Sequence, residues 1–287
     1  MKNVGIICNP NKPEAKKILS KLILWLEQRE KKVLVGQDAV SILNKPAVAI
    51  SLAELKNRCD LIIAMGGDGT LLKAARYVGA SGVPIFGVNI GSLGFLTDIV
   101  LDELYARLND VLCNRFKIDR RMVLEAKIGK DRYCALNDFV ISMGASCRMI
   151  ELEIYVSEDY VCKYPADGVI VATPTGSTAY SLASGGPIVD PRMKAIVISP
   201  ICPHSLGVRP MVVHPDEKVK IIVKSKAEDV RFTVDGQTGL QLPSDTKIVI
   251  KRARHSIKLI KAKPMSFYEI LRNKLKWGGR GDYAKRT

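Results

Sequence analysis

The chain has 287 residues and a net charge of +15, and 47% of its residues are hydrophobic and 25% charged. This length favours two domains, and the hydrophobic fraction allows a large buried core, which argues against wholesale disorder. No apolar run approaches the roughly 20 residues of a membrane span, and no secretory leader is visible, so we expect a cytoplasmic protein with no membrane partner.

The first part of the chain alternates between strand and helix patterns. Apolar runs predict strands at Val4–Cys8, Lys32–Val35, Asp60–Met65 and Val83–Val88. Helical spacing predicts helices at Glu14–Glu30, Ser51–Asn57, Thr70–Val78 and Leu101–Leu112. Such alternation is typical of a parallel sheet flanked by helices, so we expect an α/β domain here.

After about Phe116 the pattern changes to short alternating segments, which are typical of antiparallel sheet with one wet face. The predicted strands are Met122–Ile128, Ala135–Ser142, Glu151–Val156, Lys218–Lys224, Val230–Val234 and Lys247–Lys251. A final amphipathic helix is predicted at Ser266–Lys276, with Ser266 as its N-cap and Gly278 and Gly279 past its end. We expect this helix to cross back to the first domain and a polar tail to follow.

The sharpest motif is a glycine loop, Gly66-Gly67-Asp68-Gly69-Thr70, between a predicted strand and a predicted helix. Glycines let the backbone turn tightly and bring its N–H groups close to a ligand, and the N-terminus of a helix favours phosphate. The loop has neither the P-loop pattern nor a third glycine at the spacing of a dinucleotide fingerprint. It therefore predicts a phosphate site of a different kind.

Asp68 is unusual in such a loop, because a carboxylate directed at a phosphate is repelled by it. Its presence makes sense if it accepts a proton from an attacking hydroxyl group or holds a cation. The alternative is that Asp68 simply caps the helix that follows.

Two further polar motifs adjoin apolar runs: one follows such a run, and the other stands at the head of one. Thr173–Ser181, followed by Ser184-Gly185-Gly186-Pro187, offers many small hydroxyl groups that could line a polar pocket, or could simply pack well. It lacks the Gly-x-Ser-x-Gly frame of a serine hydrolase. Asn137 and Asp138 could grip the two hydroxyl groups of a ribose, the amide donating and the carboxylate accepting, although such a pair is more often just a turn.

Most of the positive charge lies near the C-terminus, where residues 218–287 hold 18 Lys or Arg against six Asp or Glu, a net +12. This positive field attracts phosphate-rich ligands such as nucleotides, and nucleic acid is the rival partner. We see no motif of basic and aromatic residues that would stack on bases, so we expect no nucleic-acid partner. A solvated basic face is the commoner meaning. The seven cysteines form no Cys-x-x-Cys pair and the three histidines are scattered, so no metal cluster or disulfide framework is expected.

Taken together, these motifs resemble those of the bacterial NAD kinase family, over nearly the whole chain. The matching runs are Gly66–Thr70, Gly91–Leu96, Asn137-Asp138, Thr173–Tyr180, Ser184–Pro187, Pro203–Leu206, Arg209-Pro210, Asp235–Gln237 and Lys274–Gly278. The glycine loop is shared with diacylglycerol, sphingosine and phosphofructokinase relatives, whereas the Thr-rich run is far more particular to NAD kinases.

The resemblance implies a role for each matching residue. Asp68 would be the general base that takes the proton of the ribose 2′-hydroxyl group, with the loop residues Gly66, Gly67, Gly69 and Thr70 beside the phosphates. The residues that would bind NAD are Asp68, Gly69, Lys73, Asn137, Asp138, Arg148, Asp167, Thr178, Ala179, Tyr180, Ser181 and Gln237. Among them, Asp167 would lie near the nicotinamide end and Arg148 would approach across a subunit contact.

The family's architecture also becomes an expectation for this chain. It implies a Rossmann-like α/β domain (residues 1–115 plus about 266–278), a predominantly antiparallel all-β domain (residues 116–265) and a polar tail (residues 279–287). The site would lie between the domains of a homo-oligomer, either a dimer or a tetramer. Mg²⁺ or another divalent cation would arrive with ATP and have no protein-ligated cluster of its own.

Two departures bear on the site. Many members have Asn-Glu where this chain has Asn137-Asp138, so the carboxylate here lies about one bond length further back. Many also carry a basic residue just before the Asp-Gly pair, where this chain has Pro165 and Ala166, with Lys163 further back. The alternatives to an NAD kinase are a lipid kinase of the same superfamily, of the diacylglycerol or sphingosine type, and a non-catalytic NAD(P)-binding regulator.

Overall fold

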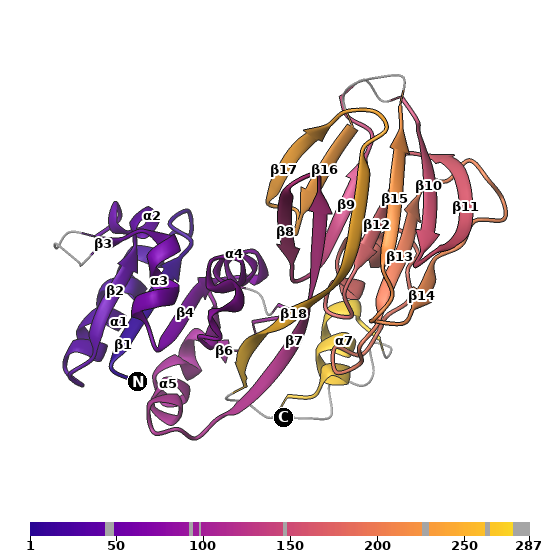
Figure 1. Cartoon of the computed structure of the whole chain (residues 1–287). Helices are drawn as coiled ribbons and strands as arrows, with labels where there is room; N and C mark the ends of the chain where they lie inside the picture. Colours follow the sequence, from indigo (N-terminus) through magenta and orange to yellow (C-terminus); the bar gives the residue numbers. More distant parts are fainter. Residues whose placement is uncertain are drawn as a thin grey trace. The chain divides into compact units, whose positions relative to one another are not determined.

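The computed structural model describes residues 1–43, 49–91, 94–97, 99–145, 148–225, 230–261 and 265–277. The chain divides into two compact units, which Figure 1 shows in the colours of the sequence. The first unit comprises Met1–Asp119 and Lys258–Thr287, and the second comprises Arg120–Ile257. Strand β18 (Lys247–Lys261) runs from the second unit into the first.

The first unit is built on a parallel sheet with the strand order β18-β5-β4-β1-β2-β3 and with β6 beside β5. Its strands other than β18 are β1 (Asn3–Cys8), β2 (Lys32–Gly36), β3 (Ala49–Ile50), β4 (Leu61–Gly66), β5 (Ile85–Asn89) and β6 (Ile99–Val100). The predicted parallel α/β arrangement is therefore confirmed.

Helices cover both faces of this sheet, because its strands are apolar on both sides. The helices are α1 (Ala15–Glu27), α2 (Gln37–Val40), α3 (Leu52–Arg58), α4 (Asp68–Val78) and α5 (Leu104–Leu112). One face packs on α1 and α5, whose Trp25 and Tyr105 rings lie 5.4 Å apart. On the other face Leu55 of α3 approaches Gly5 of β1, and Leu71 of α4 approaches Gly87 of β5.

The chain order of the central strands creates a crevice at the end of the sheet. From β1 the chain moves outward through β2 and β3, and it then returns to place β4 on the other side of β1. In open α/β sheets, ligands bind at such a switch point, beyond the carboxyl ends of the two strands. Here those ends lead into Asn9 and Gly67, which begin the two loops at the switch point.

The second unit is a sandwich of antiparallel sheets, as the sequence predicts. One sheet has the order β14-β13-β12-β9-β16-β17, and the other contains β11-β10-β15-β18 together with β7 and β8. Their strands are β7 (Lys117–Ile128), β8 (Asp131–Ala135), β9 (Asp138–Ser142), β10 (Ile150–Val156), β11 (Asp159–Ala166), β12 (Gly168–Ala172), β13 (Ile196–Ile201), β14 (Met211–Val213), β15 (Val219–Lys224), β16 (Val230–Val234) and β17 (Thr238–Leu242). Their inward residues form one apolar core that includes the stacked rings of Phe139 and Phe232.

Several strands differ from the prediction. The single strand expected at Ala135–Ser142 is two strands, β8 and β9, because the chain turns at Leu136 and Asn137. Strands β11, β13, β14 and β17 were not among the predicted ones, and β18 continues ten residues beyond the predicted Lys251. The many charged residues of β18 obscure the apolar pattern of this strand in the sequence. Ala253, Ile257 and Leu259 nevertheless point inward and are buried.

The C-terminal helix α7 (Phe267–Leu275) confirms the predicted N-cap. The Ser266 hydroxyl group accepts the Glu269 backbone N–H at 3.1 Å, and the Glu269 carboxylate accepts the Ser266 N–H at 2.8 Å, which completes a capping box. Ile270 and Leu271 are its buried residues, and the helix is grouped with the first unit. Gly278 and Gly279 lie outside the described residues. No helix among the described residues is both long and apolar enough to span a membrane.

Candidate functional site

The glycine loop lies at the switch point of the first unit, directly after β4. Helix α4 begins at Asp68, two residues before the predicted start, and Gly67 is its N-cap. The N–H groups of Thr70 and Leu71 both bond the carbonyl oxygen of Gly67, at 3.0 and 3.2 Å. The structure thus places the phosphate-loop residues Gly66, Gly67, Gly69 and Thr70 together where β4 ends and α4 begins.

The carboxylate of Asp68 does not cap the helix, because α4 has no side-chain cap bond. It instead holds the segment Gly94–Thr97. Oδ2 accepts the Phe95 backbone N–H at 2.8 Å, while Oδ1 accepts the N–H groups of Leu96 and Thr97 at 3.0 and 3.2 Å. The Thr97 hydroxyl group lies 3.2 Å from the same Oδ1. Asp68 is therefore fixed by backbone donors that are 27 to 29 residues away in the sequence.

Two buried side chains support this arrangement from behind. Asn89, 3% exposed at the end of β5, donates from its amide to the Thr97 hydroxyl group at 2.9 Å, and Thr97 is fully buried. The Thr97 hydroxyl group in turn donates a hydrogen bond to Asp68 Oδ1, so the three residues form a chain of hydrogen bonds. A Cβ atom at Gly94 would overlap Asp68 Oδ1, so only glycine lets the loop approach the carboxylate this closely.

A cavity of about 440 Å³ lies at the same switch point. The loops after β1 and β4 line it, with Gly67 and Gly69 on one side and Asn9, Asn11 and Lys12 on the other. Backbone N–H groups at a helix N-terminus, together with lysine side chains, suit a phosphate chain.

Lys73, which was predicted to reach the substrate phosphates, also lines this cavity. Its ammonium group forms an ion pair with Asp38 of α2, and both side chains are about one-third exposed or less. Asp38 Oδ1 is buried and has no hydrogen-bond partner among the described residues. Lys73 is therefore held at the rim by a carboxylate that the sequence reasoning did not identify.

In the second unit, three of the predicted motifs meet at the ends of the neighbouring strands β12, β9 and β16 of the six-stranded sheet. Asp138 on β9 pairs with Ala172 at the end of β12, so the Asn137-Asp138 pair lies beside the start of the Thr-rich loop. On the other side of β9, Val234 of β16 pairs with Phe139, which brings Asp235 next to the same pair. Segments separated by up to about 100 residues thus converge on Asn137 and Asp138.

Asp235 holds the Asn137-Asp138 segment in place at these strand ends. Its carboxylate accepts the backbone N–H groups of Leu136, Asn137 and Asp138 at 3.0, 2.7 and 3.1 Å, and its own N–H donates to the carbonyl oxygen of Asp138 at 3.0 Å. Asp235 adopts a positive φ of 51°, a conformation that aspartate tolerates better than most residues. Sequence reasoning noted the Asp235-Gly236-Gln237 motif but assigned a role to Gln237 alone, since no local signal links Asp235 to Asn137.

Asp138 is the most strongly perturbed acid in this group. Its side chain is 4% exposed, and burial, reinforced by the charge of Asp235, raises the pKa of its carboxyl group to about 7. Asn137, in contrast, is half-buried and reaches solvent. The pair therefore combines a neutral amide at the surface with a carboxyl group that is close to half-protonated at neutral pH.

The Thr-rich loop is joined to the Asn137 segment by several hydrogen bonds. The Thr173 N–H donates to the Asn137 carbonyl oxygen at 2.8 Å, and the Thr173 hydroxyl group donates to that of Leu136 at 2.6 Å. A Cβ atom at Gly176 would overlap the Asn137 carbonyl oxygen, which explains a glycine here. The hydroxyl groups of Thr173 and Ser177 are buried and bonded to Leu136 and Val189 as well as within the loop, so they hold the loop to neighbouring segments.

The predicted adenosine-pocket residues are placed unequally. Thr178 and Ala179 are half-buried, and Tyr180 is 48% exposed. Ser181 is fully buried, and its hydroxyl group shares a hydrogen bond of 2.8 Å with Ser199 on β13. Ser181 therefore supports the loop from beneath, while Gln237 is exposed in the turn after Asp235.

Asp167 lies at the other end of β12, and Arg148 lies just before β10 of the other sheet. Asp167 immediately precedes β12 and Thr173 immediately follows it, so six residue steps of about 3.4 Å separate them by about 20 Å. Because β10 and β11 pair Ile150 with Ala166, the exposed Arg148 is at the same strand end as Asp167. The structure thus places the two predicted ends of the dinucleotide site at opposite ends of one strand.

Within the described part of the chain, no three His, Cys, Asp or Glu side chains are grouped so that they could hold a metal ion. Among the described residues that line the cavity beside the glycine loop, the polar groups are mainly amides and lysines, with Asp38 paired to Lys73, and such groups suit phosphate oxygens.

Comparison with known proteins agrees with these features. Residues 4–116 match the family model of the ATP-NAD kinase N-terminal domain, and residues 136–262 match that of the ATP-NAD kinase C-terminal domain. An NAD kinase of Desulforamulus reducens is 45% identical over 281 residues, which cover 96% of this chain and 98% of the relative. An NAD kinase of Moorella thermoacetica is 41% identical over 97% of this chain and 91% of its own.

Solved structures show the same fold. The structure of yeast NADH kinase complexed with NADH superposes with a TM-score of 0.88 at 30% identity and covers 96% of this chain and 87% of its own. An NAD kinase from Archaeoglobus fulgidus superposes with a TM-score of 0.78 at 24% identity, over 96% and 100% of the two chains. The glycine loop, the Asn-Asp pair and the Thr-rich loop thus lie in a chain that belongs to the ATP-NAD kinase family.

Proposed function

We propose that the protein is an ATP-dependent NAD kinase, which transfers the γ-phosphoryl group of ATP to the 2′-hydroxyl group of the adenosine ribose of NAD, giving NADP and ADP. The name NAD kinase of the relatives at 41–45% identity supports the reaction. The yeast relative, whose structure contains NADH, supports a dinucleotide acceptor. The observation that carries the proposal is the placement of Asp68 between the glycine loop and a segment whose N–H groups fix it.

In this mechanism Asp68 is the general base. Within the described residues its Oδ1 accepts three hydrogen bonds, whereas Oδ2 accepts one, from Phe95. A carboxylate oxygen has two lone pairs, so Oδ2 retains one for the proton of the attacking hydroxyl group. As that proton moves to Oδ2, the ribose oxygen forms a bond to the γ-phosphorus and the bond to the β-phosphate oxygen breaks.

The glycine-loop cavity would hold the phosphates. Gly67 and Gly69 offer backbone amides, while Lys12 and Lys73 supply positive charge beside them. Mg²⁺ would enter with ATP and neutralise its phosphate oxygens, and it would take its ligands from those oxygens and water. The protein's contribution is then to position the groups and to accept one proton.

The residues at the ends of strands β12, β9 and β16 would hold the adenosine half of NAD. Asn137 and Asp138 would bond the ribose hydroxyl groups, Thr178–Ser181 would form the wall of the pocket, and Gln237 would contact the ligand from the neighbouring turn. Asp167, about 20 Å along β12, would meet the nicotinamide end. We also propose a homo-oligomer, in which the exposed Arg148 reaches a neighbouring subunit's substrate.

An acceptor screen tests the proposed reaction. The purified chain is incubated with Mg-ATP and with NAD, NADH, diacylglycerol or sphingosine, and NADP is detected with an NADP-specific dehydrogenase. We expect product from NAD or NADH and no phosphorylation of the lipids. Lipid phosphorylation would identify a lipid kinase, and NAD binding without ADP formation, also with polyphosphate as donor, would identify a non-catalytic binder.

A further inference from the structure

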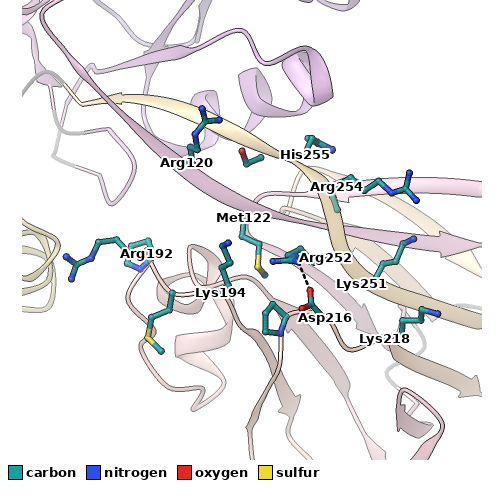
Figure 2. Close-up of a pocket in the computed structure, with 15 residues that line it drawn as sticks. Arg120, Met122, Arg192, Lys194, Asp216, Lys218, Lys251, Arg252, Arg254 and His255 are labelled. Atoms are coloured by element: carbon teal, nitrogen blue, oxygen red, sulfur yellow. Dashed lines mark hydrogen bonds and ion pairs between the residues drawn. The ribbon is translucent and has the colours of Figure 1, made fainter.

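A cavity of about 590 Å³ in the second unit is lined mainly by basic side chains (Figure 2). Seven of its described lining residues are Lys or Arg, and they come from the start of β7, the loop before β13, the turn before β15, and β18. Among the described residues that line it, Asp216 is the one acid. The residues assigned to the glycine loop or to NAD are not among them, so the proposed reaction leaves this cavity unexplained.

The cations in the cavity outnumber the carboxylates that neutralise them. Arg252 forms an ion pair with Asp216 at 2.5 Å, and Lys251 lies 3.5 Å from Glu125. Arg192, at the rim, is paired with Asp190, which is outside the lining. Within the described ranges, no carboxylate is paired with the other four, which are Arg120, Lys194, Lys218 and Arg254. Like charges that share a concave surface repel one another until an anion enters.

The cations are spread along the cavity. Figure 2 shows Lys194 and Arg252 near its middle, Arg192 toward one end, and Lys218 and Lys251 toward the other. A single phosphate could contact one cluster of such groups, whereas a chain of phosphates could contact all of them in turn. Pro191 and Pro215 stiffen the loops that contribute Lys194 and Lys218, because proline fixes its own φ.

His255 also lines the cavity. Its Nε2 atom is buried and has no hydrogen-bond partner among the residues described, so it is not open to a ligand in the cavity. The unpaired cations are therefore the groups that the cavity offers to a ligand.

We propose that this cavity binds a linear oligophosphate, using residues that are separate from those assigned to catalysis. The volume lies in the range of small-ligand pockets, and the described lining residues include no Phe, Tyr or Trp to stack on bases, so nucleic acid fits the cavity poorly. The ligand is either a free inorganic oligophosphate or the phosphate chain of a nucleotide. Both present closely spaced negative charges to Arg and Lys.

The test is calorimetric titration of the full chain with inorganic tripolyphosphate, without divalent cations, at low salt. The test variant is Arg120→Ala with Lys194→Ala, two exposed side chains without a carboxylate partner in the described ranges, so the change breaks no ion pair there. The matched control is Lys127→Ala with Lys130→Ala, which removes the same charge from exposed positions of the same unit outside the cavity. A third variant, Lys12→Ala, removes a positive charge from the cavity at the glycine loop and should weaken anion binding there.

We expect the Arg120/Lys194 variant to bind tripolyphosphate about tenfold or more weakly, and the other two variants to retain a site of wild-type affinity. Competition by ATP in the Lys12→Ala protein would identify a nucleotide's phosphate chain, and its absence would identify the free oligophosphate. Equal weakening in the Lys127/Lys130 control, loss of all binding in Lys12→Ala, or no binding by the wild type would overturn the proposal. The readout is binding alone, so it does not depend on the proposed reaction.

Discussion

Replacement of Asp138 by Asn should change how the stability of the protein depends on pH. The folded-state pKa of Asp138 is about 7 because the carboxyl group is buried and faces the charge of Asp235, whereas the unperturbed value is 3.8. Between these values the folded chain keeps the proton that the unfolded chain has lost. Stability contributed by this group therefore falls as pH rises from about 4 to 7, and it levels off above 7.

The size of the effect follows from the two pKa values. Their separation corresponds to about 4 kcal/mol in total, of which about 3 kcal/mol is lost between pH 5 and 8. Asparagine has nearly the same shape and cannot ionise, so it avoids this loss. The backbone N–H groups that hold the segment to Asp235 are unchanged by the substitution.

The assay is urea unfolding followed by circular dichroism at pH 5 and pH 8, for wild type, Asp138→Asn and a matched control. The control is Asp159→Asn, an exposed aspartate on β11 of the same unit. We expect the free energy of unfolding of Asp138→Asn, relative to wild type, to rise by about 3 kcal/mol from pH 5 to pH 8, and the control to show no such rise. A difference that is the same at both pH values would refute the inference that Asp138 is buried as a neutral acid.

Three other substitutions test the surroundings of Asp68 and the last helix. Thr97→Val removes a hydroxyl group bonded to Asp68, so kcat for NADP formation should fall about tenfold while KM for NAD stays nearly unchanged. Thr97→Ser should restore kcat, and a change confined to KM would contradict this reasoning. Gly94→Ala should lower kcat by about 10²-fold because its Cβ atom displaces the Asp68 carboxylate, and wild-type turnover would show that the loop yields freely. Ser266→Ala should lower the free energy of unfolding by about 1 kcal/mol in urea titrations, through the lost capping bond; an unchanged midpoint would refute the role of the cap.

Local patterns were enough to predict much of the fold. The strand–helix alternation, the change to period-two segments and the capping serine all depend on residues within a few positions of one another. The glycine loop could be placed at a strand end for the same reason. The switch point, in contrast, depends on the order of strands in the sheet, which no local pattern contains.

The contacts that organise the site were out of reach because they join distant segments. Asp68 meets Phe95–Thr97, and Asp235 meets Leu136–Asp138 nearly 100 residues away. Strand β18 was predicted too short because its Lys and Arg residues resemble a solvated turn, although their neighbours are buried. Charge patterns along one segment cannot show that other segments complete a basic cavity around it.

The role of Asp68 as general base is tested most directly by comparing wild type with Asp68→Asn in the NADP-forming assay, with NAD binding measured on the same samples. Asparagine can keep the bonds from Leu96 and Thr97 on its one oxygen, but its amide nitrogen, in the place of Oδ2, can accept neither the Phe95 N–H nor the proton of the ribose hydroxyl group. We expect kcat to fall by roughly 10²–10⁴-fold while NAD binds with wild-type affinity. Wild-type turnover by Asp68→Asn would remove Asp68 from the mechanism and contradict the account.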